Sequence, residues 1–246
     1  MMEKYWLFYF LALVAEIIGT ISGFGSSILF IPIASLFFDF QIVLGVTAIF
    51  HIFSNLSKIY LFKNGIDKRI ALKMGIPAII AVIIGALLTN LLPQKELEVI
   101  MSAAVFFVAL YLLFNTNRKL NDTNSNLIKG GLASGFLAGL VGTGGAIRGL
   151  TLTAFSLEKN VFIATSALID LGVDISRAIV YTANGYVHKE FLFTLPFLLA
   201  ISIIGTWLGK LVLKRMPQHW FKTIVLVVIL LTSITQLFIY LLQIIK

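Results

Sequence analysis

The sequence predicts an all-α polytopic membrane protein made of two inverted repeats of about five hydrophobic segments each, with glycine-rich broken or re-entrant helices that meet near the membrane midplane. Three observations lead to this prediction. Of the 246 residues, 59% are hydrophobic and 12% are charged, whereas a soluble domain carries about 25% charged residues. Apolar segments follow one another along the chain, and a set of short motifs occurs twice in the same order.

The apolar segments can be placed in order from the hydropathy of the chain. The polar run 115–126, rich in Asn and Thr, separates the first five from the last five. We therefore expect a first transmembrane repeat at residues 1–120, a polar linker at 121–126 and a second transmembrane repeat at 127–246. The segments are 5–21, 27–38, 42–62, 70–92, 97–114, 127–141, 147–157, 161–181, 191–212 and 220–245.

Composition excludes several classes of function. Segment 5–21 lacks a strongly basic start and a small-x-small cleavage site, and it contains Glu16, so we expect it to be mature structure and not a signal peptide. The absence of cysteine excludes disulfides, thiolate metal sites and cysteine nucleophiles. The net charge of +8 lies largely in loops, where it sets membrane orientation and does not indicate nucleic-acid binding. We expect a multi-pass protein of a prokaryotic plasma (inner) membrane.

The motifs of the first half recur in the second half. Five matches in the same order are difficult to attribute to chance, and two helix breaks at corresponding positions are the best sequence indication of a transporter's binding site. The matches, most of them offset by 119 residues, are Gly23-Phe-Gly25-Ser26 with Gly142-Thr-Gly144-Gly145, Ser57-Lys58 with Ser176-Arg177, Pro77 with Pro196, Asn64-Gly65 with Asn184-Gly185, and Pro93-Gln94 with Pro217-Gln218.

The loop charges favour an inverted second half with both termini outside. If the short segments at each break form a re-entrant hairpin or two full crossings, the basic residues divide 12 to 4 between the two faces. If each pair forms one broken crossing, they divide 10 to 6, which obeys the positive-inside rule less well. The first face would carry Lys63, Lys68, Arg69, Lys73, Arg118, Lys119, Lys129, Lys159, Lys210, Lys214, Arg215 and Lys222, and the other Lys4, Lys95, Lys189 and Lys246.

The stretch 139–148 predicts a seat for a small anion. Its four glycines in seven residues cannot continue a helix, and the helix that follows directs its N–H groups and positive dipole end at the gap. Arg148 adds a charged fork suited to an oxyanion, and hydroxyl groups at both breaks add donors. The predicted substrate-binding residues are Ser22, Gly23, Gly25, Ser26, Ser27, Gly142, Thr143, Gly144, Gly145 and Arg148.

The third segment of each half carries a polar stripe at positions i, i+4 and i+7, which is one face of a helix. Ionisable groups at membrane depth are costly and often mark a pathway. We expect these residues, with a carboxylate of the first segment, to line the route, to form exchangeable ion pairs or to carry a coupled proton. The residues are Glu16, His51, Asn55, Lys58, Asp170, Asp174 and Arg177.

Simpler roles remain open for the same residues. Asp174 and Arg177 could pair only to fix helix packing, and Lys58 could extend to the membrane surface. His51 could make an interhelical hydrogen bond. Glu16 could anchor Arg148 or Lys58, or be partly solvated near a hairpin tip.

The break motifs resemble those of the TauE/SafE family of sulfite and organosulfonate exporters, and the resemblance covers nearly the whole chain. Each repeat of that family opens with G-x-G-G-G, followed by a proline four or five residues on. The copies here are Gly23-Phe24-Gly25-Ser26-Ser27 with Pro32 after it, and Gly142-Thr143-Gly144-Gly145-Ala146, preceded by Gly135-Phe-Leu-Ala138-Gly139 and with Thr151 in place of the proline.

The resemblance implies secondary transport of sulfur-containing anions such as sulfite, sulfoacetate or other organosulfonates. Our hypothesis from the two breaks is an exporter that works by alternating access. We expect no enzymatic activity, cofactor or metal site. The expected partners are a small anionic substrate and the lipid bilayer, without nucleic acid, and a homodimer is compatible with a bundle of this size. The substitutions Ser26, Ser27 and Arg148 change the polarity of the expected site.

Other functions remain as alternatives. The chain could transport another small anion such as a carboxylate, act as an intramembrane enzyme, or serve as a non-transporting assembly subunit. Metal transport is disfavoured, because the chain has three histidines, no cysteine and no acidic cluster at the breaks. An enzyme is disfavoured because neither a His-Glu-x-x-His pair nor a Gly-x-Ser-Gly setting occurs.

Overall fold

The computed structural model describes residues 2–35, 37–91, 121, 123–155 and 157–244, with scattered residues between 99 and 114. Most of the predicted segment 97–114, the run 115–120 and the Pro93-Gln94 motif lie outside the described residues. The described elements are helices: α1 (Met2–Ser22), α2 (Ser27–Ala34), α3 (Phe40–Leu61), α4 (Lys68–Leu88), α6 (Asn124–Val141), α7 (Gly145–Ala154), α8 (Lys159–Ala183), α9 (Leu195–Arg215) and α10 (Gln218–Ile244), with the 3₁₀ helices η1 (Lys63–Gly65), η2 (Thr89–Leu91) and η3 (Lys189–Thr194).

The outer surface of the bundle is apolar. Three helices of the described chain, Phe40–Leu61, Lys68–Leu88 and Leu192–Arg215, are long and apolar enough to cross a membrane, and two shorter apolar helices accompany them. Large side chains such as Leu72, Ile76 and Ile80 are exposed along α4. Exposed apolar surface of this extent suits hydrocarbon and not water, in agreement with the predicted helical membrane protein.

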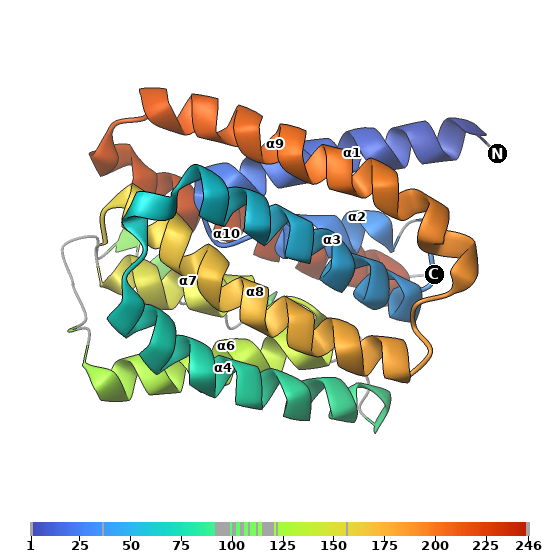
Figure 1. The fold of residues 1–246 in the computed structure, drawn as a ribbon, viewed down its shortest axis with the longest axis horizontal. Helices are drawn as coiled ribbons and strands as arrows, with labels where there is room; N and C mark the ends of the chain where they lie inside the picture. Colours follow the sequence, from blue (N-terminus) through green and yellow to red (C-terminus); the bar gives the residue numbers. More distant parts are fainter. Residues whose placement is uncertain are drawn as a thin grey trace.

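Helices taken in the same order from the two halves of the chain run in opposite directions. In Figure 1, α1 and α3 run from right to left, whereas α6 and α8 run from left to right, and α4 and α9 are likewise opposed. The helices α3 and α8 pack together, while α1 packs on α9 and α6 packs on α4. The beginning of α1 and the last turns of α10 lie at the same end of the bundle.

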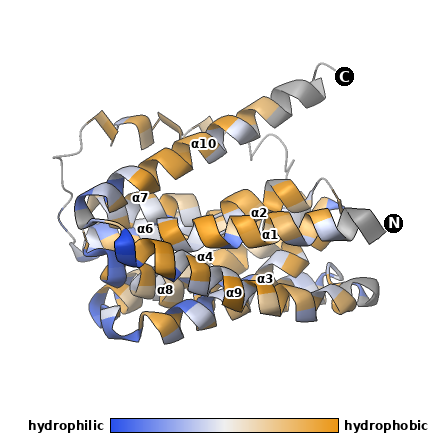
Figure 2. Ribbon diagram, turned by 90° about the horizontal axis from the view of Figure 1, so that it is seen from above, coloured by the Kyte–Doolittle hydropathy of each residue, from blue (hydrophilic) through white to orange (hydrophobic). Residues whose placement is uncertain are grey.

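The basic residues gather at the opposite end. Figure 2 shows hydrophilic residues concentrated where α3 ends and α4, α6 and α8 begin, and hydrophobic residues along the rest of the bundle. We call this the basic end. Its described basic residues are Lys63, Lys68, Arg69, Lys73, Lys129, Lys159, Lys210, Lys214, Arg215 and Lys222. Arg118, Lys119, Lys95 and Lys246 lie outside the described residues.

A row of glycines brings α6 against α4. A Cβ atom added at Gly131, Gly135 or Gly139 would collide with a backbone carbonyl oxygen of α4, belonging to Met74, Ala78 and Val82 respectively. Each successive pair lies one helical turn further along, as in the small-xxx-small contacts of membrane helices. The close contact holds α6 against α4, and so positions the break that follows at Gly142.

Candidate functional site

The two helix breaks meet in the interior of the bundle. The helices α1 and α6 are each followed by a glycine with positive φ, Gly23 at +76° and Gly142 at +78°, a conformation that ends helices and that other residues rarely adopt. A Cβ atom added at Gly145, the first residue of α7, would collide with the carbonyl oxygen of Phe24. The tip of the first break therefore lies directly against the start of α7.

Arg148 joins the breaks through its buried guanidinium. Its Nη2 donates to the Phe24 carbonyl oxygen at 2.9 Å and also pairs with Asp170, while its Nε donates to Ser166 Oγ at 2.9 Å. Phe24 lies in the first break, Arg148 in the first turn of α7, and the other two residues in α8. One side chain thus connects both breaks and the polar face of α8.

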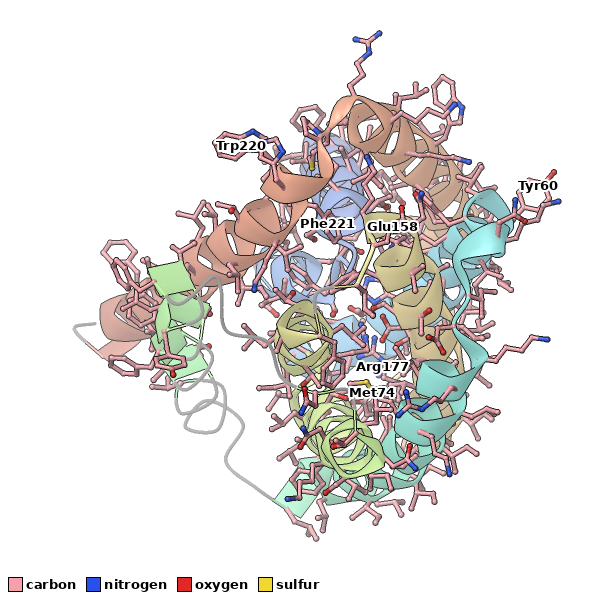
Figure 3. The ribbon with its side chains drawn as sticks, turned by 90° about the vertical axis from the view of Figure 1, so that its left-hand side faces the viewer. Tyr60, Met74, Glu158, Arg177, Trp220 and Phe221 are labelled. Atoms are coloured by element: carbon pink, nitrogen blue, oxygen red, sulfur yellow. The ribbon has the colours of Figure 1, made fainter. Side chains whose placement is uncertain are left out.

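Arg177 forms the second ion pair. Its Nη2 lies 2.7 Å from Asp174 Oδ1, and its Nη1 donates to the Gly142 carbonyl oxygen at 2.6 Å. Asn55 Nδ2 donates to the other Asp174 oxygen at 2.7 Å, so α3 and α8 meet through one shared carboxylate. Arg177 Nε is buried without a hydrogen-bond partner among the described residues. Figure 3 shows Arg177 in the interior, surrounded by helices.

Glu16 is fully buried and accepts hydrogen bonds from α3, from the first break and from α9. Lys58 Nζ lies 2.9 Å from its Oε1 and forms the third ion pair. Ser54 Oγ and Ser26 Oγ each donate at 2.6 Å. Threonines at two further positions complete the shell, Thr206 Oγ1 at 3.1 Å and Thr20 Oγ1 at 3.3 Å. Lys58 therefore points into the bundle and not to the membrane surface, and Glu16 anchors it.

His51 bridges the second ion pair and the third. Its Nδ1 lies 3.3 Å from Arg177 Nη2 and its Nε2 lies 2.9 Å from Ser26 Oγ. A guanidinium can only donate, so Nδ1 accepts and the proton of the neutral ring resides on Nε2. Nε2 then donates to Ser26, whose hydroxyl donates to Glu16. A directed chain of hydrogen bonds therefore runs from Arg177 to Glu16.

A small cavity lies among these groups. Its free volume is about 10 Å³, roughly the space of one water molecule. The polar atoms around it come from both breaks and from α3 and α8. It is lined by Gly25, Ser26, Ser27, His51, Ser54, Asn55, Lys58, Ala138, Gly142, Gly144, Gly145, Asp170, Val173, Asp174 and Arg177.

The starts of α2 and α7 lie at this cavity, and neither has a side-chain cap from the residue before it. Neither Ser26 before α2 nor Gly144 before α7 makes a side-chain capping hydrogen bond. Both residues and the residues that follow them line the cavity. Uncapped N–H groups at a helix start, together with the helix dipole, attract anions.

The charged groups of the site balance. Lys58, Arg148 and Arg177 pair with Glu16, Asp170 and Asp174 respectively. Isolated buried charges are costly unless they are paired, so the arrangement is a neutral one. An anion can gain a guanidinium here only if a carboxylate moves away or is neutralised. Among the described residues no group of three metal-ligating side chains occurs.

The structure brings most of the predicted residues together, with differences in detail. Ser22 Oγ donates to carbonyl oxygens of its own helix, Ile18 at 2.9 Å and Gly19 at 3.3 Å, and is not among the cavity residues. Gly23 packs against Phe162 and Ile163. Thr143 and Arg148 are both buried, but neither is among the residues that line the cavity; Arg148 reaches it through its partner Asp170.

Sequence reasoning missed four hydroxyl residues of the site. Ser54 lies four residues before Lys58, and Ser166 four before Asp170, so a longer reading of the helical stripes would have included both. Thr20 likewise lies four residues after Glu16. No local signal identifies Thr206, because α9 reaches Glu16 only through the packing of distant segments.

The comparisons with known proteins give one match, to a protein family. A family model described as "Sulfite exporter TauE/SafE" matches residues 8–235, which include both breaks and all three ion pairs. No curated protein and no solved structure matches the chain.

Proposed function

Because the chain belongs to the TauE/SafE sulfite exporter family of membrane transporters, we propose that it exports sulfite, sulfoacetate or other organosulfonates by alternating access, as a secondary transporter. The observation that carries this proposal is the hydrogen bond from Arg148 Nη2 to the Phe24 carbonyl oxygen. It holds a buried guanidinium against both helix breaks, where the uncapped starts of α2 and α7 lie at the cavity.

Substrate binding replaces a carboxylate partner of an arginine. A sulfonate or sulfite group has three oxygens, which can accept from a guanidinium fork, a hydroxyl group and backbone N–H groups. Arg148 with Asp170, and Arg177 with Asp174, supply two such exchangeable pairs. Ser26 and Ser27 supply hydroxyl groups at the same cavity.

In the proposed transport cycle the central cavity opens to one face at a time. A free volume of about 10 Å³ admits about one water molecule and is too small for a sulfonate, so the cavity widens when the substrate binds. The halves act as inverted repeats, and the opposite directions of α3 and α8 support this relationship. Rocking of one half against the other would close the cavity to one side of the membrane and open it to the other.

The basic end faces the cytoplasm in this proposal, and both termini face outward. The gathering of lysines and arginines at that end supports this orientation in a plasma membrane. An inside-negative potential then favours exit of a monovalent anion by about 2.3 kcal/mol per 100 mV. Export therefore needs no coupling ion.

The test is anion transport by the purified protein in liposomes. With an imposed inside-positive potential, labelled sulfite should accumulate faster in proteoliposomes than in empty liposomes. Sulfoacetate, sulfate and acetate in parallel arms define the substrate class. Movement of acetate without any sulfur anion would support the carboxylate alternative and contradict the proposal.

A binding measurement separates a wrong substrate from a failed reconstitution. A ligand present at a hundred times its dissociation constant stabilises a protein by about 2.7 kcal/mol. Sulfite or a sulfonate should therefore raise the melting temperature of the detergent-solubilised protein, and acetate should not. The exposed Lys129 at the basic end provides a matched control, because Lys129→Gln should bind and transport as the native protein does.

A further inference from the structure

A second, larger pocket lies at the basic end, outside the central site. Its volume is about 720 Å³, within the usual range for small-molecule sites. The walls are the end of α3 with η1, the start of α8 and the end of α9. None of its lining residues belongs to the three ion pairs of the central site.

The pocket is strongly positive. Its ionisable lining residues other than Tyr60 are Lys63, Lys159, Lys210, Lys214 and Glu158. The glutamate is engaged at the start of α8, where its Oε1 accepts from Asn160 Nδ2 at 2.8 Å. The pocket therefore carries four positive charges and one negative charge, and the negative group already accepts a hydrogen bond from Asn160.

Two of the lysines are fixed in place by the helix ends. Lys159 Nζ donates to the carbonyl oxygens of Leu213 at 3.1 Å and Met216 at 2.6 Å. Lys210 Nζ donates to the Leu61 carbonyl oxygen at 2.5 Å and lies 5.2 Å from the centre of the Phe62 ring. Lys63 and Lys214 are exposed at the rim. The pocket thus combines two lysines held by hydrogen bonds, Lys159 and Lys210, with two exposed lysines whose side chains can adjust to a ligand.

Apolar side chains lead from the rim toward the middle of the bilayer. On α3, Leu56 and Tyr60 are 48% and 76% exposed and lie one turn apart, and Lys63 follows in η1 just after that helix ends. On the neighbouring α9, Trp207 and Leu211 are 51% and 40% exposed and precede Lys214 at positions i, i+4 and i+7, which share a helix face. Each of the two rim lysines is therefore preceded along the chain by two exposed side chains with large apolar parts.

The depth of the pocket matches the headgroup region of a bilayer. Figure 3, which views the basic end, shows Tyr60 and Trp220 projecting outward from the bundle. Exposed tyrosine and tryptophan are typical of the membrane–water interface. Basic pockets between transmembrane helices at this level bind the phosphate of acidic lipids.

From these observations we infer that the pocket binds an anionic phospholipid. The phosphate lies among the four lysines, and the acyl chains follow the apolar faces of α3 and α9. The lipid joins the end of α9 to α3 and α8 and so stabilises the folded bundle. A soluble anion would use the lysines but leave both apolar faces without a role. This inference does not depend on which anion the central site transports.

The test is lipid-dependent thermal stability of the full chain in dodecyl maltoside micelles. Separate samples contain phosphatidylglycerol, phosphatidylcholine or inorganic phosphate at matched concentrations. The pocket variant is Lys63→Gln/Lys214→Gln, and the control variant is Lys68→Gln/Lys129→Gln, which removes two exposed lysines of the same end outside the pocket. Only rim lysines are changed, so the pocket variant should melt near the native protein without lipid.

Phosphatidylglycerol should raise the melting temperature of the native protein and of the control variant. In the pocket variant, the lipid concentration for half of that shift should rise about thirtyfold, as expected from the loss of two surface-proximal lysines. Each single substitution should give about a fivefold rise. An equal loss in both double variants would show diffuse surface attraction. Equal stabilisation by phosphate or by phosphatidylcholine would show a soluble-anion or uncharged-lipid site. Each of these results would overturn the inference.

Discussion

Asn55 and Asp174 join the two halves of the chain at corresponding positions. Asn55 Nδ2 donates to Asp174 Oδ2 at 2.7 Å, and the residues are 119 positions apart in the sequence. The same spacing relates Gly23 to Gly142. The contact between α3 and α8 therefore has the same sequence spacing as the two helix breaks, and it holds an amide on one side and a carboxylate on the other.

The Asn55 amide should contribute to folding stability, because it donates to the Asp174 carboxylate. Asn55→Ala removes one donor from buried Asp174 and should cost about 1–3 kcal/mol of stability. Asn55→Asp places a second carboxylate against the first and should lower the melting temperature further. Equal stability of Asn55→Asp and Asn55→Ala at neutral pH would contradict a repulsion between two carboxylates at this contact.

Two variants should separate the contribution of Arg148 to folding stability from its contribution to anion binding. Arg148→Gln leaves Asp170 buried without its cation, which should cost about 3–5 kcal/mol. The double variant Arg148→Gln/Asp170→Asn restores neutrality and should recover much of that loss, as measured by thermal unfolding. Neither variant should bind or transport a sulfur anion. Native affinity in the stable double variant would remove Arg148 from the site.

The second helix break should be far less tolerant of a side chain than a surface turn with the same backbone. Gly142 and Gly185 have φ of +78° and +79°, so alanine at either position carries a conformational cost of about 1–2 kcal/mol. At Gly142 the added Cβ would also lie 2.5 Å from Ile31 and from Leu44, whereas at Gly185 nothing lies within 4 Å. Overpacking adds about 1–3 kcal/mol. Gly142→Ala should therefore melt well below Gly185→Ala, and equal melting temperatures would contradict the described packing.

The orientation of the bundle can be tested by labelling single cysteines, because the native chain has none. Lys63→Cys lies at the basic end, and Asn184→Cys lies exposed at the opposite end, just after α8. In intact cells a membrane-impermeant maleimide should label Asn184→Cys and spare Lys63→Cys. Permeabilisation should expose both. The reverse pattern would place the basic end outside and contradict the proposed orientation.

Local features of the sequence predicted the breaks and the polar stripes. Glycine permits positive φ wherever it occurs, so the breaks at Gly23 and Gly142 follow from the residues themselves. Helical periodicity likewise puts Asp170, Asp174 and Arg177 on one face without knowledge of any neighbour. The apolar composition determined the class of protein, because a chain this hydrophobic must place most of its surface in lipid or in its own interior.

The partners of the buried charges were decided only by the tertiary structure. From the sequence, Arg148 is an unpaired counter-charge for a substrate, but folding brings Asp170 against it and makes the site neutral. Likewise, Glu16 could have met Arg148 or Lys58: folding brings Lys58 of α3 to it, and the packing of α1 on α9 adds Thr206. Such choices depend on which helices approach within hydrogen-bond distance. Periodicity along one helix contains no information about the helix that lies opposite.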